Sequence, residues 1–98
     1  MNFEEVLVAS RRLFVLRQIV ECDGEIVEST LYKLACRRFH GQTTRESVRR
    51  DLDHLQGQHC VTENWDGNIC RVAITERGED AAFGKIDVVG VERSRWER

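Results

Sequence analysis

Residues 43–55 read TTRESVRRDLDHL, and this segment has the pattern of a capped amphipathic helix. Thr43 and Glu46 have the S/T-x-x-E spacing of a capping box, in which hydroxyl and carboxylate oxygens accept the free N–H groups at a helix start. Three aliphatic residues recur at helical spacing and form one narrow stripe: Val48, Leu52 and Leu55. The segment therefore predicts a helix over residues 44–56 that packs on the core along one apolar stripe and is polar on its other faces.

Two more helices are predicted before this segment. Apolar residues recur at three- and four-residue intervals over residues 2–22, where Asn2 suits the N-cap and Gly24 the C-terminal stop. A short extended link then leads to a second helix over residues 30–39, with Ser29 as its N-cap. A tight turn separates the second and third helices, as in a helix-turn-helix.

A β-hairpin is predicted after the third helix. Residues 61–65 alternate in polarity, and the Asp-Gly pair at residues 66–67 is a strong signal for a two-residue turn. With that turn, Val61 pairs with Val72 on the return strand, residues 68–74. The face that carries Val61, Cys70, Val72 and Ile74 is expected to pack on the helices.

The predicted fold is α+β, with three helices, a two-stranded hairpin wing and a short C-terminal helix, in the order of a winged helix-turn-helix. Thr75 is expected to cap the short helix, which ends before Gly84. One domain is expected over residues 1–85. The tail, residues 86–98, is expected to add a strand, to contact a second subunit or to stay disordered.

Composition excludes several classes of protein. No apolar run approaches the roughly 18 residues of a membrane span, and Glu4 and Glu5 precede any apolar stretch, unlike in a secretory signal. A cytoplasmic location is therefore expected. The cysteines lie at or beside apolar positions and form no C-x-x-C pair, so buried free thiols are expected rather than disulfides or a zinc site: Cys22, Cys36, Cys60 and Cys70.

The net charge of −2 conceals an uneven distribution of charge. Residues 33–50 carry six lysines and arginines against one glutamate. In a winged helix-turn-helix, the third helix fits the major groove of DNA, and the hairpin beside it can reach the phosphate backbone. The predicted DNA contacts are Thr43, Thr44, Arg45, Ser47, Arg49, Arg50 and His54 on the third helix, Arg37 and Arg38 on the second, and Arg71 on the hairpin.

Other charged residues are given structural roles. Asp51 is expected to hold a nearby arginine in a salt bridge. Arg11, Arg12 and Arg17 are expected to be solvated or to pair with acidic residues of a second subunit.

The segment of residues 43–55, with its Arg-Arg-Asp-Leu and spaced leucine, resembles the recognition helix of DeoR-type regulators. Residues 74–78, ITERG, are similar to the segment that follows the wing in ArsR- and MarR-like winged helices. From Arg11 to Gly84 the chain resembles small ArsR-like proteins of Mu-like bacteriophages. This resemblance implies a winged-helix fold and a role in transcription regulation.

Two departures limit what the resemblance implies. The third helix lacks the closely spaced cysteines of ArsR-type metal sensors, so metal sensing is not implied. The chain has no room for the sugar-phosphate-binding domain of DeoR-type proteins, so no small-molecule effector is expected.

A homodimer is expected because the first helix carries apolar residues beyond the reach of a three-helix core: Phe3, Val6 and Leu7. Two recognition helices related by a two-fold axis predict a roughly palindromic DNA site. The alternative is a winged-helix protein-interaction module that does not bind DNA, favoured by the acidic pI of about 5.9, in which Trp65 and the tail dock a partner. No catalytic constellation, cofactor site or metal site is expected.

Overall fold

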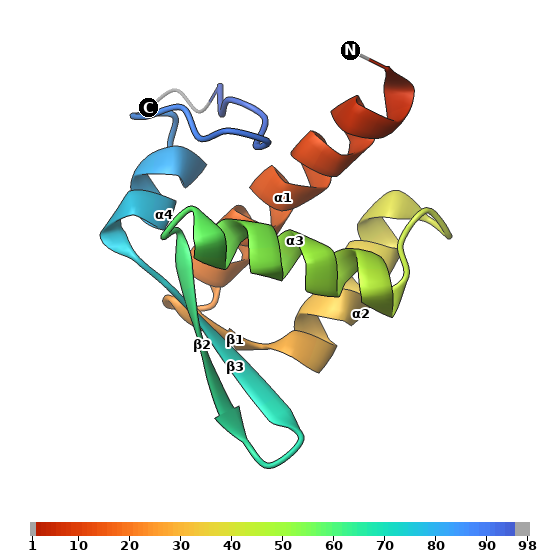
Figure 1. The fold of residues 1–98 in the computed structure, drawn as a ribbon, viewed down its shortest axis with the longest axis vertical. Helices are drawn as coiled ribbons and strands as arrows, with labels where there is room; N and C mark the ends of the chain where they lie inside the picture. Colours follow the sequence, from red (N-terminus) through yellow and green to blue (C-terminus); the bar gives the residue numbers. More distant parts are fainter. Residues whose placement is uncertain (1, 96–98) are drawn as a thin grey trace.

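The computed structural model describes residues 2–95 and shows an α+β fold (Figure 1). Over these residues the chain forms four helices and one three-stranded antiparallel sheet. The elements in chain order are α1 (Phe3–Glu21), β1 (Glu25–Val27), α2 (Glu28–Phe39), α3 (Arg45–Gly57), β2 (Val61–Asp66), β3 (Ile69–Ile74) and α4 (Glu76–Ala82).

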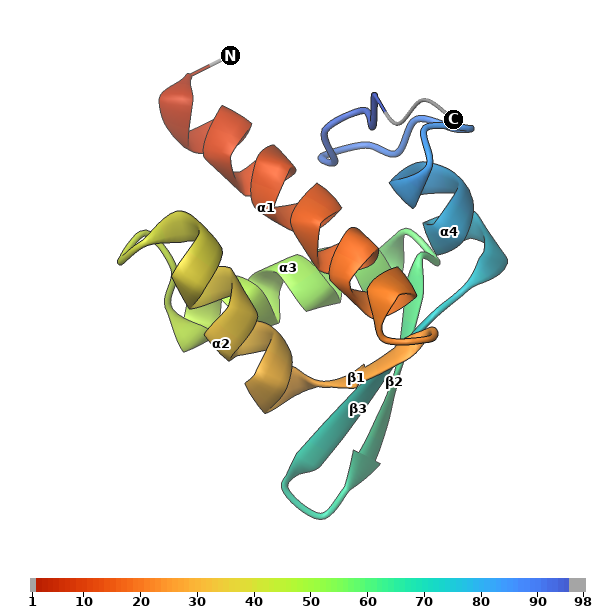
Figure 2. The same ribbon diagram turned by 180° about the vertical axis from the view of Figure 1, so that it is seen from behind.

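The ends of α1 agree with the sequence-based prediction. The side chain of Asn2 accepts the N–H of Glu5 at 2.8 Å, and Glu4 and Glu5 lie in the first turn beside the positive end of the helix dipole. The chain leaves the helix through Gly24, whose φ of 96° is in the left-handed region that glycine adopts most easily. Figure 2 shows that the N-terminal half of α1 projects beyond the other helices.

The predicted N-cap of the second helix is wrong. α2 begins at Glu28, and its N-cap is Val27, which makes no side-chain capping bond. Val27 belongs to β1, where it pairs with Arg71 of β3. Because this pairing holds the chain extended up to Val27, the helix starts directly after the strand, two residues before the start that a Ser29 cap would give.

The capping box of α3 lies one residue later than predicted. Thr44 Oγ1 accepts the N–H of Ser47 at 3.0 Å, and Ser47 Oγ accepts the N–H of Thr44 at 2.8 Å. Thr43 is buried, with only 6% of its surface exposed, and Glu46 remains in solvent. Adjacent threonines offer the same capping chemistry, and burial of the first one selects the second.

The sheet has the strand order β1-β3-β2, so the predicted extended link is an edge strand. The predicted hairpin register is wrong by two residues, because Val61 pairs with Ile74 and Asp66 with Ile69. Gly67 is the first of the two turn residues, with φ of 60°, which is the position where a type II′ turn requires glycine. A shift of two residues keeps every side chain on its predicted face, and Val61, Cys70 and Val72 are buried.

The core lies between the helices and one face of this sheet. Val48, Leu52 and Leu55 are at most 1% exposed, which confirms the predicted stripe of the third helix. The largest fully buried side chains also include Leu16, Ile19, Leu31, Val15, Val61 and Val72. No helix among residues 2–95 is long and apolar enough to cross a membrane.

All four cysteines are free thiols, but their burial differs from the prediction. Cys60 and Cys70 are buried, and desolvation raises the pKa of both thiols. Cys36 is half-buried and Cys22 is exposed, because it follows the last residue of α1 on the solvent side of the turn. The expectation of four buried thiols is therefore correct only for the two in the sheet region.

The described part of the tail packs on its own chain. Glu92 donates its N–H to the carbonyl of Ala9 in α1 at 3.1 Å, and Val88 and Ser94 are buried. Residues 86–95 form no strand. The last three residues of this tail, 96–98, lie outside the described part.

Candidate nucleic-acid interface

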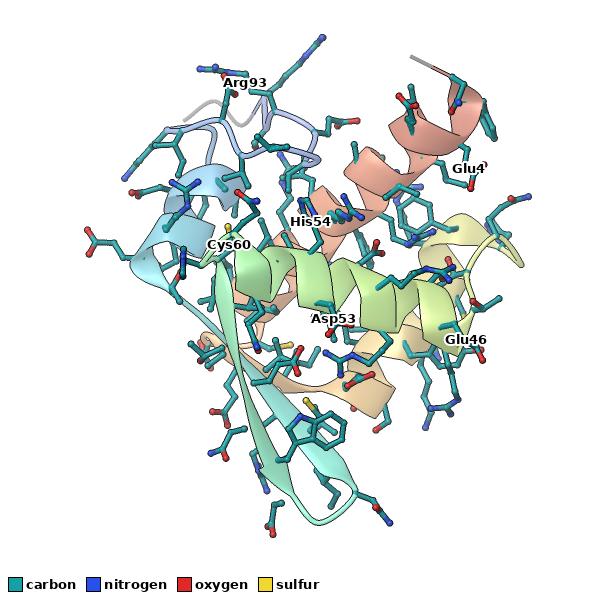
Figure 3. All side chains as sticks on the ribbon, in the orientation of Figure 1. Glu4, Glu46, Asp53, His54, Cys60 and Arg93 are labelled. Carbon is teal, nitrogen blue, oxygen red and sulfur yellow. The ribbon has the colours of Figure 1, made fainter. Side chains whose placement is uncertain are left out.

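Helix α3 lies across one face of the molecule, with the β2–β3 hairpin extending beside it (Figure 1). Figure 3 shows Glu46 near the N-terminal end of this helix, with Asp53 and His54 further along it. Neighbouring contacts place Asp53 on the side of the hairpin and His54 on the side of the tail. The exposed face of α3 is therefore bordered by the hairpin on one side and by α1 and the tail on the other.

Arg49 is held by three carboxylates. Its guanidinium contacts Glu28 at 2.5 Å, Asp53 at 3.2 Å and Glu63, and these residues come from α2, α3 and β2. The same guanidinium lies over the ring of Trp65, 5.7 Å from the centroid. Burial disfavours its charge, but attraction by Glu28 and Glu63 raises the pKa of Arg49 above the ordinary value. Arg49 thus joins three elements, and its charge is compensated within the chain.

Replacing Arg49 with alanine is expected to lower the free energy of unfolding by about 1 kcal/mol, as for a partly exposed ion-pair network. Three carboxylates would then lie close together without a cation. Urea unfolding followed by circular dichroism measures the effect, and Arg37→Ala is the matched control because Arg37 is exposed and has no ion pair among residues 2–95. Equal stability of the two variants would show that the Arg49 network contributes nothing.

Asp51 is buried at the contact between α1 and α3. Its carboxylate is 1% exposed and accepts bonds from Arg11, through Nε and through Nη2 at 3.2 Å, and from Arg12 Nε at 3.1 Å. Arg12 also donates to the carbonyl of Gly90 at 3.2 Å. The prediction that Asp51 forms a structural salt bridge is confirmed. The prediction that Arg11 and Arg12 are solvated is wrong, because both bind a carboxylate from a distant helix.

Arg17 also differs from the prediction. Its Nη2 donates to Ser94 Oγ at 2.5 Å, which ties the tail to α1. A sequence pattern could not indicate this pair, because the two residues are 77 positions apart.

The residues predicted to contact DNA do not all face solvent. Thr43 and Ser47 are buried, so the expectation that they point outward is wrong. His54 is half-buried, and its Nε2 lies 2.6 Å from the carbonyl of Val89 in the tail. The remaining predicted contacts, apart from Arg49, are exposed: Arg37, Arg38, Thr44, Arg45, Arg50 and Arg71.

Two exposed arginines lie on the N-terminal half of α3. Arg45 stacks on the ring of Tyr32, 4.6 Å from the centroid, which fixes its position without neutralising its charge. Arg50 has no ion-pair partner among residues 2–95. Arg38 lies elsewhere, over the ring of Phe39, which packs edge-on against Phe14 of α1. The structure therefore separates Arg38 from the arginines of α3.

No group of three or more His, Cys, Asp or Glu side chains in the described part of the chain is arranged to hold a metal ion.

A protein of known source matches nearly the whole chain. The uncharacterized protein gp26 of Escherichia phage Mu is 39% identical over 93 residues, covering 93% of this chain and 94% of gp26. The chain belongs to the gp26 family. No protein-family profile and no solved structure matches it.

The match with gp26 agrees with the phage part of the resemblance seen in the sequence. Since it spans almost the full length of both proteins, the gp26 family shares more than one short helix motif.

Proposed function

We propose that this member of the gp26 family is a winged-helix protein that binds duplex DNA with the N-terminal half of α3 and acts as a transcription regulator without catalytic activity. The order helix, strand, two helices, hairpin supports this proposal, as does the pairing of β1 with β3, which brings the hairpin beside α3. The observation that carries the proposal is the exposure of Arg45 and Arg50 on the outer side of α3.

Charge explains why only part of α3 would contact DNA. On the hairpin side, Arg49 is surrounded by Glu28, Asp53 and Glu63, and three carboxylates against one arginine make this region unfavourable for phosphate. The rest of the N-terminal half carries Arg45 and Arg50 against one exposed carboxylate, Glu46, and its backbone N–H groups add partial positive charge.

Other exposed cations would position the protein. Lys33 and Arg37 lie one turn apart on α2, and Arg71 lies on β3 of the hairpin. Such contacts to phosphates set orientation and register without reading the sequence. Arg45 and Arg50 would neutralise phosphates on a duplex of any sequence and contact guanine edges at a preferred site, where a bidentate contact contributes roughly 1–3 kcal/mol of discrimination.

The test measures the binding of a labelled random-sequence duplex by fluorescence anisotropy at several salt concentrations. The double variant Arg45→Gln/Arg50→Gln is expected to reduce the slope of log K against log salt by about 2, because each phosphate neutralised contributes about 0.9. The matched control, Lys85→Gln/Arg93→Gln, removes the same charge from exposed residues after α4 and should leave the slope unchanged.

An absence of salt-dependent binding by the wild-type protein at micromolar concentration would refute the proposal. If binding is present, selection of bound duplexes from a random pool gives the preferred sequence and its symmetry.

A second candidate function is a protein-interaction module. It is favoured by large apolar side chains exposed on the hairpin, since Trp65 is 54% and Ile69 48% exposed. For such a module, charge reversal of Arg45 and Arg50 would leave partner binding intact, whereas Trp65→Ala would weaken it. The two candidates therefore respond to different substitutions.

A further inference from the structure

The rest of the chain covers the N-terminal half of α1 only in part, since residues 2–6 are exposed and residues 7–10 are half-buried. The first buried residue of the helix is Arg11, and the preceding residues extend for about 12 Å at 1.5 Å per residue. Phe3 is 77% and Val6 45% exposed on this half. A projecting helical segment is marginal in water unless it packs on another surface, so a partner for this half is expected.

Two grooves run along this half of the helix. One, of about 740 Å³, lies on the side of α3, and the other, of about 500 Å³, lies on the side of the tail. Glu4, Val8 and Arg12 line both grooves and therefore form the ridge between them. These three residues are spaced at i, i+4 and i+8. Side chains at this spacing form a ridge that packs into the groove of a second helix.

The groove on the tail side suits the close approach of a helix. Val8 and Ala9 lie between the charged residues that line this groove, and Gly90 of the tail lies beside Arg12. Glu4 and Glu5 mark one end and Arg12 the other. This groove lies away from Arg50, which lines only the groove on the side of α3.

The charges along the ridge are self-complementary about Val8. In a two-fold antiparallel arrangement centred on Val8, Glu4 of one copy meets Nη2 of Arg12 of the other, because Arg12 Nε binds Asp51 and Nη1 binds the carbonyl of Gly90. Arg11 and Arg12 share the single carboxylate of Asp51, so this cluster keeps one positive charge for Glu4 of the partner, and the same contact forms twice. A parallel arrangement would instead oppose Glu4 to Glu4 and Arg12 to Arg12. Like charges disfavour that arrangement, and complementary charges set the register of a symmetric contact.

We propose that this protein forms a two-fold symmetric homodimer in which the N-terminal halves of two α1 helices pack antiparallel, with Val8 at the axis and Glu4 of each copy against Arg12 of its partner. The proposal is independent of DNA binding. The sequence predicted a dimer contact through Phe3, Val6 and Leu7. The proposed contact uses the adjacent ridge of Glu4, Val8 and Arg12 instead. Two α3 helices related by this axis would suit a palindromic site.

The first experiment locates the axis by cross-linking. Val8→Cys is expected to form an intermolecular disulfide under mild oxidation, because residues at a two-fold axis between close-packed helices lie within disulfide range. Val6→Cys is the matched control, since Val6 is a valine on the same half helix but lines neither groove. The wild-type protein, with its native cysteines, reports the background. Equal or greater cross-linking of Val6→Cys would overturn the proposed axis.

The second experiment measures the oligomeric state by sedimentation equilibrium without DNA. The wild-type chain of 11.4 kDa is expected at twice that mass at tens of micromolar. Glu4→Arg should weaken the dimer at least tenfold by opposing Arg12 of the partner, and Val8→Asp should abolish it. Glu21→Arg makes the same charge change at the other end of α1 and should have no effect.

A monomeric wild-type protein at 100 µM, or a dimer that survives Val8→Asp, would overturn the proposal. Circular dichroism of each variant shows that α1 remains folded. Because no DNA is present, failure here is distinct from failure of the DNA-binding proposal.

Discussion

Replacing Asp51 with asparagine is expected to lower the free energy of unfolding by about 3–5 kcal/mol. The carboxylate is 1% exposed and the Arg11 side chain 5% exposed, so loss of the negative charge leaves a buried guanidinium without its counter-ion. Asparagine keeps the shape and one acceptor oxygen, so the cost is that of the missing charge. Arg12, which binds the same carboxylate, loses its ion pair as well.

Urea unfolding of Asp51→Asn and Asp53→Asn gives a matched comparison within α3. Asp53 is 68% exposed, and its substitution is expected to cost under about 0.5 kcal/mol. The triple variant Arg11→Met/Arg12→Met/Asp51→Leu should recover much of the loss, because replacing every member of a buried ion cluster by apolar residues is often neutral. Similar small effects for Asp51→Asn and Asp53→Asn would contradict this account of the buried pair.

Replacing Gly78 with alanine is expected to cost about 3 kcal/mol, at the upper end of the range for overpacking. A Cβ at this position of α4 would overlap the carbonyl oxygen of Cys60 and lie 2.7 Å from Cγ1 of Ile74. That carbonyl accepts the N–H of Thr75 at 3.0 Å, and Thr75 caps α4. The backbone cannot yield there without loosening the start of the helix.

Gly57→Ala is the matched control for this substitution. Gly57 is the last residue of α3, and an added Cβ would meet nothing within 4 Å. Alanine is expected to be neutral or to stabilise by up to about 1 kcal/mol at this position, following helix propensity. Thermal unfolding of both variants measures the difference, and a Gly78→Ala variant as stable as the wild type would refute the predicted overlap.

Much of the candidate site could be predicted from local patterns, because the patterns concern neighbours along the chain. The stripe of Val48, Leu52 and Leu55 and the exposure of Arg45 and Arg50 follow from helical periodicity alone. The ion pairs of Arg49 with Glu28 and Glu63 do not follow from periodicity, because these residues are 21 and 14 positions away in the chain. Sequence patterns could not separate Arg49, which is neutralised, from Arg50 beside it.

The sequence by itself determined the four helices and the hairpin, the caps at Asn2 and Thr75 and the apolar stripe of α3, because these depend on residues within one or two turns of each other. Only the tertiary structure decided that Asp51 holds Arg11 and Arg12, that β1 joins the sheet, and that the tail packs on α1. These contacts join residues up to about 80 positions apart in the chain, such as Glu92 and Ala9. Which distant charges meet depends on how the helices pack, and no local spacing encodes that packing.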